Sequence, residues 1–209
     1  MTINCKQLDR INKTLENFPS AKLQIVTKNR DIKTIKELIE KGYSLFGENK
    51  VQEANEKFKD FNASNLDLHL IGPLQTNKVK LALQVFNTIQ SIDREKLVNE
   101  IVKVKNKSEI KTVDFFIQVN IGEEEQKSGV LPNNLERLYN HCINQNLNIS
   151  GLMCIPPLGD NAKIYFDKIR SLRDKLNLNL KLSMGMSSDY EISLNCGSNL
   201  IRVGSIIFN

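Results

Sequence analysis

The sequence alternates between short apolar segments and amphipathic segments eight times, and this alternation restricts the fold more than any other feature. The apolar segments have the length and the β-branched content of buried strands, whereas the amphipathic segments repeat apolar residues at helical spacing. Strict alternation of strand and helix indicates a parallel sheet with helical crossovers. The strands are expected at 23–28, 44–48, 67–71, 88–92, 113–120, 149–155, 180–184 and 200–204.

The number of repeats favours a closed barrel. An open doubly wound sheet could have the same pattern, but eight repeats in about 200 residues fit a (β/α)8 barrel near its lower size limit. Another helix, expected at 3–17, would cover the barrel in place of a helix after the last strand. Seven helices are expected between the strands, at 31–41, 50–60, 76–85, 94–106, 132–145, 160–176 and 189–195. With no linker in the sequence, the prediction is a single α/β domain over residues 1–209, a TIM-type barrel with an additional N-terminal helix.

Composition narrows the function classes. The formal charge is +5, but the lysines are spread along the helices with no basic block, which does not favour nucleic-acid binding. No apolar run approaches the ~18 residues of a membrane helix, and the polar N-terminus has no secretory signal. The four cysteines form no C-x-x-C pair and have no metal-ligand spacing, which predicts reduced thiols, a cytoplasmic location and no metal.

Lys28 lies at the expected C-terminal tip of the first strand. In parallel α/β proteins that end of the sheet is where the chemistry takes place. A lysine beside the apolar residues of Leu23–Val26 is expected to be partly desolvated, and desolvation favours the neutral, nucleophilic form of an amine. The alternative is an ordinary surface lysine, since the chain has 29 lysines and arginines. The working hypothesis is that Lys28 carries a covalent cofactor.

Serines and glycines follow the last two strands, where barrels frequently bind phosphate. The segment 183–188 supplies hydroxyls and backbone N–H groups just before a helix, whose N-terminus would favour an anion. Gly204 lets the backbone approach a ligand after the eighth strand, and Ser205 adds a hydroxyl. The alternative is an ordinary turn and helix cap. These segments predict a phosphate site opposite Lys28.

A phosphate site together with a Schiff-base lysine implies pyridoxal 5'-phosphate, and Arg202 then gains a role. The residue beside the pyridine nitrogen sets the electronics of this cofactor. Arginine cannot accept a proton, so it would leave the ring nitrogen unprotonated and the electron sink weak. The alternative for Arg202 is an ion pair with Glu48 or Asp93.

Motifs along nearly the whole chain resemble, in order, those of the pyridoxal phosphate homeostasis protein family. They lie at 46–53, 69–78, 118–129, 151–153, 182–187 and 202–204. The resemblance implies a barrel like the N-terminal domain of alanine racemase. It implies these cofactor-binding residues: Lys28 as the covalent lysine, Asn49 and Met184 at the pocket, Ser187, Gly204 and Ser205 at the phosphate, and Arg202 at the ring nitrogen.

The sequence departs from the family pattern at several positions near these motifs. Asn29, Arg30 and Asp31 follow Lys28 without the usual proline. Lys50 stands where a tyrosine is usual, and Ser205 replaces a threonine but keeps its hydroxyl.

The residues favour cofactor binding over catalysis. Racemisation needs acid and base groups on both faces of the substrate α-carbon. The four tyrosines are expected in helices or before strands, away from the strand tips: Tyr43, Tyr139, Tyr165 and Tyr190. The prediction is therefore a non-catalytic, cytoplasmic binding protein that buffers or delivers pyridoxal phosphate in vitamin B6 homeostasis.

Other functions stay open at this point. One is a low-activity amino-acid racemase with Lys28 as its base. Another is a barrel enzyme that uses Lys28 as a Schiff-base lysine on a phosphorylated metabolite. The expected partners are pyridoxal phosphate and pyridoxal-phosphate-dependent apo-enzymes. A monomer is expected, with no nucleic-acid or membrane partner.

Overall fold

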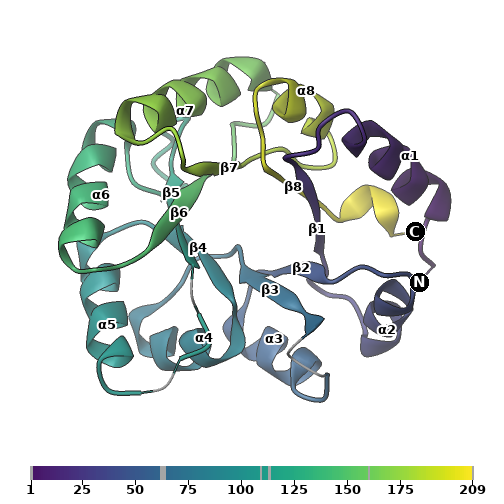
Figure 1. Cartoon of the computed structure of the whole chain (residues 1–209), viewed down its shortest axis with the longest axis horizontal. Coiled ribbons are helices and arrows are strands. Elements are labelled where there is room, and N and C mark those ends of the chain that lie inside the picture. The colour runs from purple at the N-terminus through teal and green to yellow at the C-terminus, as the bar shows by residue number, and fades with distance from the viewer. Residues whose placement is uncertain (1, 62–64, 109, 113, 160, 209) are drawn as a thin grey trace.

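Eight parallel strands pair in chain order and close into a barrel, because β1 pairs with both β2 and β8 (Figure 1). The computed structural model describes residues 2–61, 65–108, 110–112, 114–159 and 161–208. The predicted first residues of one strand and one helix, Val113 and Asp160, lie outside these ranges. The strands are β1 Lys22–Val26, β2 Leu45–Glu48, β3 Asp67–Leu70, β4 Thr88–Ile92, β5 Asp114–Val119, β6 Ile149–Cys154, β7 Lys181–Ser183 and β8 Leu200–Val203.

Helices form the outer ring and bury one apolar face each against the strands (Figure 1). They are α1 Cys5–Leu15, α2 Ile32–Glu40, α3 Val51–Phe58, α4 Val79–Val85, α5 Glu95–Lys105, α6 Leu135–Asn144, α7 Ala162–Leu176 and α8 Tyr190–Asn195. Short 3-10 turns occupy η2 Thr76–Lys78, η3 Pro132–Asn134 and η4 Ser205–Ile207. The predicted barrel and its order of elements are therefore confirmed. In the described residues, no helix has the length and apolar character that crossing a membrane requires.

The N-terminal helix α1 covers the barrel beside β1 and η4, as predicted (Figure 1). Its position is fixed by the end of the chain. Ile3 and Phe208 form an antiparallel bridge, and the Asn4 amide donates to the Ile207 carbonyl at 3.0 Å. The two ends of the chain thus hold each other next to the eighth strand.

The first strand ends two residues earlier than predicted. β1 stops at Val26, and the amide of Thr27 still bonds to the Gly47 carbonyl at 3.0 Å. Asn29 then adopts a left-handed backbone with φ 59°, and the Arg30 amide donates to the Thr27 carbonyl at 3.0 Å. This turn leads into α2, whose N-cap is Asp31, as predicted. Lys28 therefore lies in a tight loop and not on the strand.

Candidate functional site

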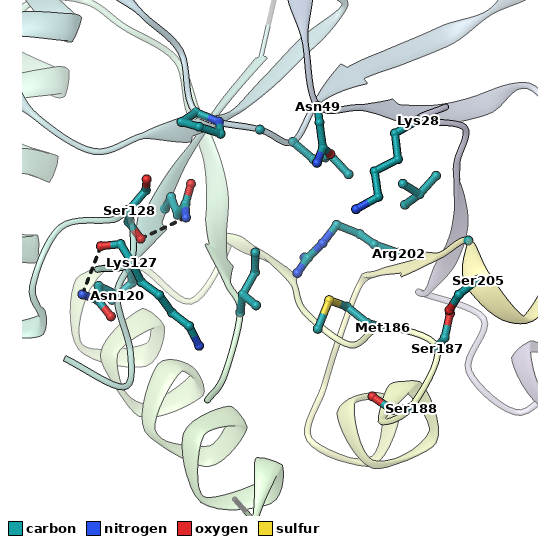
Figure 2. A pocket seen from close by; sticks show the side chains of 18 of the residues that line it. Lys28, Asn49, Asn120, Lys127, Ser128, Met186, Ser187, Ser188, Arg202 and Ser205 are labelled. Atoms are coloured by element: carbon teal, nitrogen blue, oxygen red, sulfur yellow. Dashed lines mark hydrogen bonds between the residues drawn. The ribbon is translucent and has the colours of Figure 1, made fainter. Parts of the chain in front are cut away.

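A pocket of about 620 Å³ opens at the C-terminal ends of the strands, between the loops that follow β1, β2, β3, β5, β6, β7 and β8 (Figure 2). Its volume lies in the range that small-molecule sites occupy. Six of the seven predicted cofactor residues line it: Lys28, Asn49, Ser187, Arg202, Gly204 and Ser205. Residues as far apart in the chain as Val26 and Ser205 thus meet because all strands point the same way.

The seventh predicted residue, Met184, is not part of this pocket. Its side chain is fully buried in the apolar core, and its amide donates to the Leu200 carbonyl at 3.1 Å. Met186 lines the pocket instead (Figure 2). The prediction placed the wrong methionine of this segment at the site. Ser183 points into the barrel interior, so the next side chain, Met184, points the other way into the core. Met186 lies beyond the turn at Gly185, whose φ is +94°.

Lys28 extends from the β1 loop into the pocket, towards the side from which Arg202 enters (Figure 2). Its side chain is exposed, so the desolvation expected from the neighbouring strand residues is not found. The reason is the early end of β1, which moves Lys28 out of the strand and onto the rim of the pocket. An exposed amine at this place is accessible to a carbonyl group that enters from solvent.

The two residues that flank Lys28 are held by side chains of β2 and α3 that do not line the pocket. The Thr27 hydroxyl donates to Glu48 at 2.8 Å, and Lys57 donates to the Thr27 carbonyl at 2.8 Å. The Asn29 amide donates to Glu53 at 2.8 Å. The loop is thus fixed on both sides of Lys28 by residues of β2 and α3.

Lys57 is the counter-charge that Glu48 and Glu53 share in this cluster. Its ammonium lies 2.8 Å from Glu48 and 2.7 Å from Glu53. Burial raises the pKa of the fully buried Glu48 carboxyl, and the hydrogen bonds from Lys57 and Thr27 offset only part of this shift. Burial also acts to raise the pKa of Glu53, but the hydrogen bonds from Lys57 and the Asn29 amide outweigh it and lower that pKa. Sequence reasoning missed Glu53 and Lys57; the only signal was their i,i+4 spacing on a predicted helix.

Arg202 enters the pocket from the barrel interior and is buried. Its guanidinium donates to the Ser183 hydroxyl and to the Cys154 carbonyl, both at 2.8 Å. Burial lowers the pKa of Arg202. The alternative of an ion pair with Glu48 or Asp93 is wrong, because these carboxylates pair with Lys57 and Arg94 instead.

Two serine hydroxyls mark the side of the pocket formed by the loops after β7 and β8. Ser187 and Ser205 both line the pocket, and within the described ranges neither hydroxyl has a hydrogen-bond partner (Figure 2). Gly204 lies close to β1, since a Cβ there would be 3.0 Å from the Val26 carbonyl oxygen. These groups form a cradle of small residues and available donors.

The helix after this loop is short, and one backbone amide before it is already occupied. α8 has only six residues, and the carboxylate of its N-cap, Asp189, accepts from the Met186 amide at 2.6 Å. That amide is therefore not available to an anion. Gly185 has a φ of +94° and packs against Ser193, so its role is to shape the turn.

The wall opposite this cradle belongs to the long loop after β5. Gln118 donates to the Ser128 carbonyl at 3.0 Å, and Asn120 donates to the Lys127 carbonyl at 3.4 Å (Figure 2). The side chains that line this wall thus hold the loop against the end of β5 and give the pocket a fixed far side.

Comparison with known proteins agrees with this geometry. The family model "Alanine racemase, N-terminal domain" matches residues 5–209. A pyridoxal phosphate homeostasis protein from Aquifex aeolicus is 39% identical, covering 96% of this chain and 93% of the relative. One from Haemophilus influenzae is 36% identical, covering 98% of this chain and 88% of the relative. The chain belongs to the pyridoxal phosphate homeostasis protein family. This confirms the family resemblance drawn from the motifs.

Several solved structures have the same fold as this chain. PipY of Synechococcus elongatus without pyridoxal phosphate superimposes with a TM-score of 0.83 at 32% identity, covering 94% of this chain and 99% of PipY. PipY with pyridoxal phosphate bound gives a TM-score of 0.80 at 30% identity and the same coverage. Alanine racemase from Acinetobacter baumannii shares the barrel fold at 13% identity and a TM-score of 0.75, and the match covers 93% of this chain and 58% of the racemase.

Proposed function

We propose that this chain binds pyridoxal 5'-phosphate covalently through Lys28 and acts as a cytoplasmic buffer or carrier of that cofactor. The observation that carries the proposal is the shared pocket: an exposed lysine amine, an arginine and two serine hydroxyls without described partners face one cavity. Relatives named pyridoxal phosphate homeostasis protein and the PipY structure with pyridoxal phosphate support it. The four free cysteines, three of them buried, suit a reducing compartment.

The residues present fit the cofactor group by group. Lys28 would bind its aldehyde as a Schiff base. Ser187, Ser205 and the backbone at Gly204 would hold the phosphate, because the small residues leave room and the hydroxyls are available as donors. Asn49 would line the remaining side of the ring. When bound, the cofactor supplies an electron sink.

Arg202 sets how strong that sink is. Its guanidinium keeps its proton at neutral pH, so it can donate to the ring nitrogen but cannot leave a proton on it. A cofactor held in this way is weakly activating, which suits storage or transfer better than turnover. Recipients of the cofactor would be pyridoxal-phosphate-dependent apo-enzymes, and the carrier is proposed to work as a monomer.

Catalysis would need more than Lys28. A racemase requires a second acid–base group on the opposite face of the substrate. None of the residues described as lining the pocket is a tyrosine, a histidine or a carboxylate. The second lysine of the pocket, Lys127, pairs with Glu124 and donates to the Pro156 carbonyl at 3.2 Å. We therefore propose binding without turnover.

The decisive experiment follows the colour of the protein. Added pyridoxal phosphate should produce a visible absorption band, and borohydride reduction followed by peptide mass spectrometry should locate the cofactor on Lys28. Lys28→Ala should lose the band, whereas Lys50→Ala, which removes an exposed lysine at the start of α3, should keep it. A wild-type protein that gains no band, or a label at another lysine, would overturn the proposal.

Turnover is tested separately. Amino acids incubated with the loaded protein in D₂O should show no α-proton exchange above that of free pyridoxal phosphate. Exchange that depends on Lys28 would instead support the low-activity racemase.

A further inference from the structure

The barrel interior contains a continuous line of hydrogen-bonded polar side chains that starts at Arg202. The guanidinium donates to Ser183 at 2.8 Å, and the Ser183 hydroxyl donates to Gln90 Oε1 at 2.6 Å. Gln90 Nε2 lies 2.7 Å from His69 Nδ1, and His69 Nε2 lies 2.9 Å from Asp67. Four of the five side chains are buried, and they come from strands β3, β4, β7 and β8. The line therefore joins strands that are far apart in the sequence.

The amide of Gln90 has only one orientation that satisfies all of its neighbours. Its nitrogen also donates to Gln24 Oε1 at 3.1 Å, while Gln24 donates to the Phe46 carbonyl at 3.2 Å. A reversed Gln90 amide would place its oxygen against the Gln24 oxygen. The His69 ring accepts at Nδ1 and donates from Nε2 to Asp67 in this assignment, which is inferred from the network. Gln90 therefore presents its oxygen to Ser183.

This orientation decides where the Ser183 hydroxyl proton points. A hydroxyl has one proton, and here it is used towards Gln90. With its proton held by Gln90, the Ser183 hydroxyl keeps its lone pairs directed at Arg202, which can only donate. The guanidinium is held by this bond and by the Cys154 carbonyl. Arg202 forms no ion pair with a carboxylate of the described residues; Asp189 acts on it only as a charge at longer range. Neutral acceptors thus fix the plane of the guanidinium.

We propose that Gln90 is a positioning residue that acts through Ser183 to aim Arg202 at the ring nitrogen of the bound cofactor. His69 and Gln24 keep Gln90 in the required orientation. The inference rests on the proposed function, because the ring nitrogen belongs to the proposed pyridoxal phosphate. Its consequence is specificity: the protein should distinguish a ligand with a ring nitrogen from one without it.

The test compares the dissociation constants of pyridoxal phosphate and its 1-deaza analogue, in which the ring nitrogen is replaced by C–H. The wild-type protein should prefer pyridoxal phosphate by about tenfold, since the analogue loses a hydrogen bond from a charged donor. In Gln90→Met the preference should fall by about threefold or more, while the analogue binds as before. Ser183→Ala removes only the hydroxyl and should give the same loss if Gln90→Met does not fold.

Ser198→Ala is the matched control. Ser198 is also buried and donates to the Met184 carbonyl at 2.7 Å, but it makes no bond to the line that ends at Arg202. Its loss should lower stability and leave the preference unchanged. If the network has only a structural role, Gln90→Met and Ser183→Ala should also lower stability and leave the preference for pyridoxal phosphate unchanged.

Two outcomes separate this inference from the proposed function. A wild-type protein that binds pyridoxal phosphate at Lys28 but shows no preference over the analogue overturns the inference alone. The same holds if both Gln90→Met and Ser183→Ala keep the preference. A wild-type protein that binds neither ligand overturns the proposed function as well.

Discussion

Lys57 on α3 and Glu48 on β2 form an ion pair of 2.8 Å, and both also hold Thr27, the residue before Lys28. The pair is almost fully removed from solvent, since the Lys57 side chain is 11% exposed and that of Glu48 is 0% exposed. The loop that carries the site lysine therefore depends on a charge pair between β2 and α3 whose two residues do not line the pocket.

Replacing Lys57 by Met should destabilise the protein by about 3 kcal/mol, because it leaves the buried Glu48 carboxylate without its counter-charge. Burial already raises the pKa of Glu48, and loss of Lys57 raises it further. Because the pKa of Glu48 is higher in the folded than in the unfolded protein, its protonated form stabilises the fold at pH values below the unfolded pKa, near 4.5. This contribution is lost as the pH rises through the folded pKa. The deficit relative to wild type should therefore be small near pH 4 and full at pH 8.

Urea unfolding of both proteins across this pH range measures the deficit. Lys59→Met, which removes an exposed lysine at the end of the same helix, is the control and should show little change at any pH. A Lys57→Met deficit that is the same at pH 4 and pH 8 would contradict the assignment of charge to Glu48.

The architecture could be predicted from the sequence because its signals are local. Strand and helix patterns alternate eight times, Asp31 caps its helix as predicted, and parallel strands necessarily bring their C-terminal tips to one rim. Lys28, Asn49 and Arg202 could be placed in one pocket for that reason alone.

The remaining features depend on register and on side-chain direction. Met184 and Met186 would share one direction in a regular strand, and only the turn at Gly185 sends Met186 into the pocket and leaves Met184 in the core. The exposure of Lys28 follows from a turn at Asn29 that no strand pattern indicates. The contact between Gln90 and Ser183 spans 93 positions, so only the assembled barrel shows it.

Substitutions in the proposed phosphate cradle should weaken binding of pyridoxal phosphate but not of pyridoxal. Replacing Ser187 and Ser205 by Ala should weaken binding of pyridoxal phosphate by about tenfold or more, because each hydroxyl is proposed to donate to a charged phosphate oxygen. Binding of pyridoxal, which has no phosphate, should change little. Equilibrium titrations with both compounds provide the measurement, and Ser44→Ala, an exposed serine before β2, is the control. Equal losses for both compounds would place the phosphate elsewhere.

The loop after β8 approaches β1 so closely at Gly204 that a side chain at this position should disturb it. An alanine Cβ at this position would lie 3.0 Å from the Val26 carbonyl oxygen and 3.2 Å from the Val26 Cβ. The backbone oxygen cannot move without disturbing β1, so Gly204→Ala should cost about 1–3 kcal/mol in unfolding free energy. It should also weaken pyridoxal phosphate binding, because Ser205 moves with the loop. Unchanged affinity together with unchanged stability would show that the loop has room for a side chain.

The cysteine thiols should react very differently with an alkylating reagent in the native and in the unfolded protein. Cys5 is exposed, whereas burial raises the pKa of the Cys142 and Cys154 thiols to about 12 and also raises the pKa of Cys196. At pH 8 the Cys142 and Cys154 thiols are therefore about one part in ten thousand thiolate, the form that reacts. Cys196 is shielded by its burial.

Iodoacetamide should therefore label only Cys5 in the native protein at pH 8, and all four cysteines in urea. Mass spectrometry of the peptides counts the labels. Since the Cys154 carbonyl accepts from Arg202, the same experiment reports on the site: protein labelled in the native state should bind pyridoxal phosphate as the unlabelled protein does. Rapid native labelling of Cys154, with loss of binding, would mean that β6 opens at this position, and the fixed plane of the Arg202 guanidinium would then be wrong.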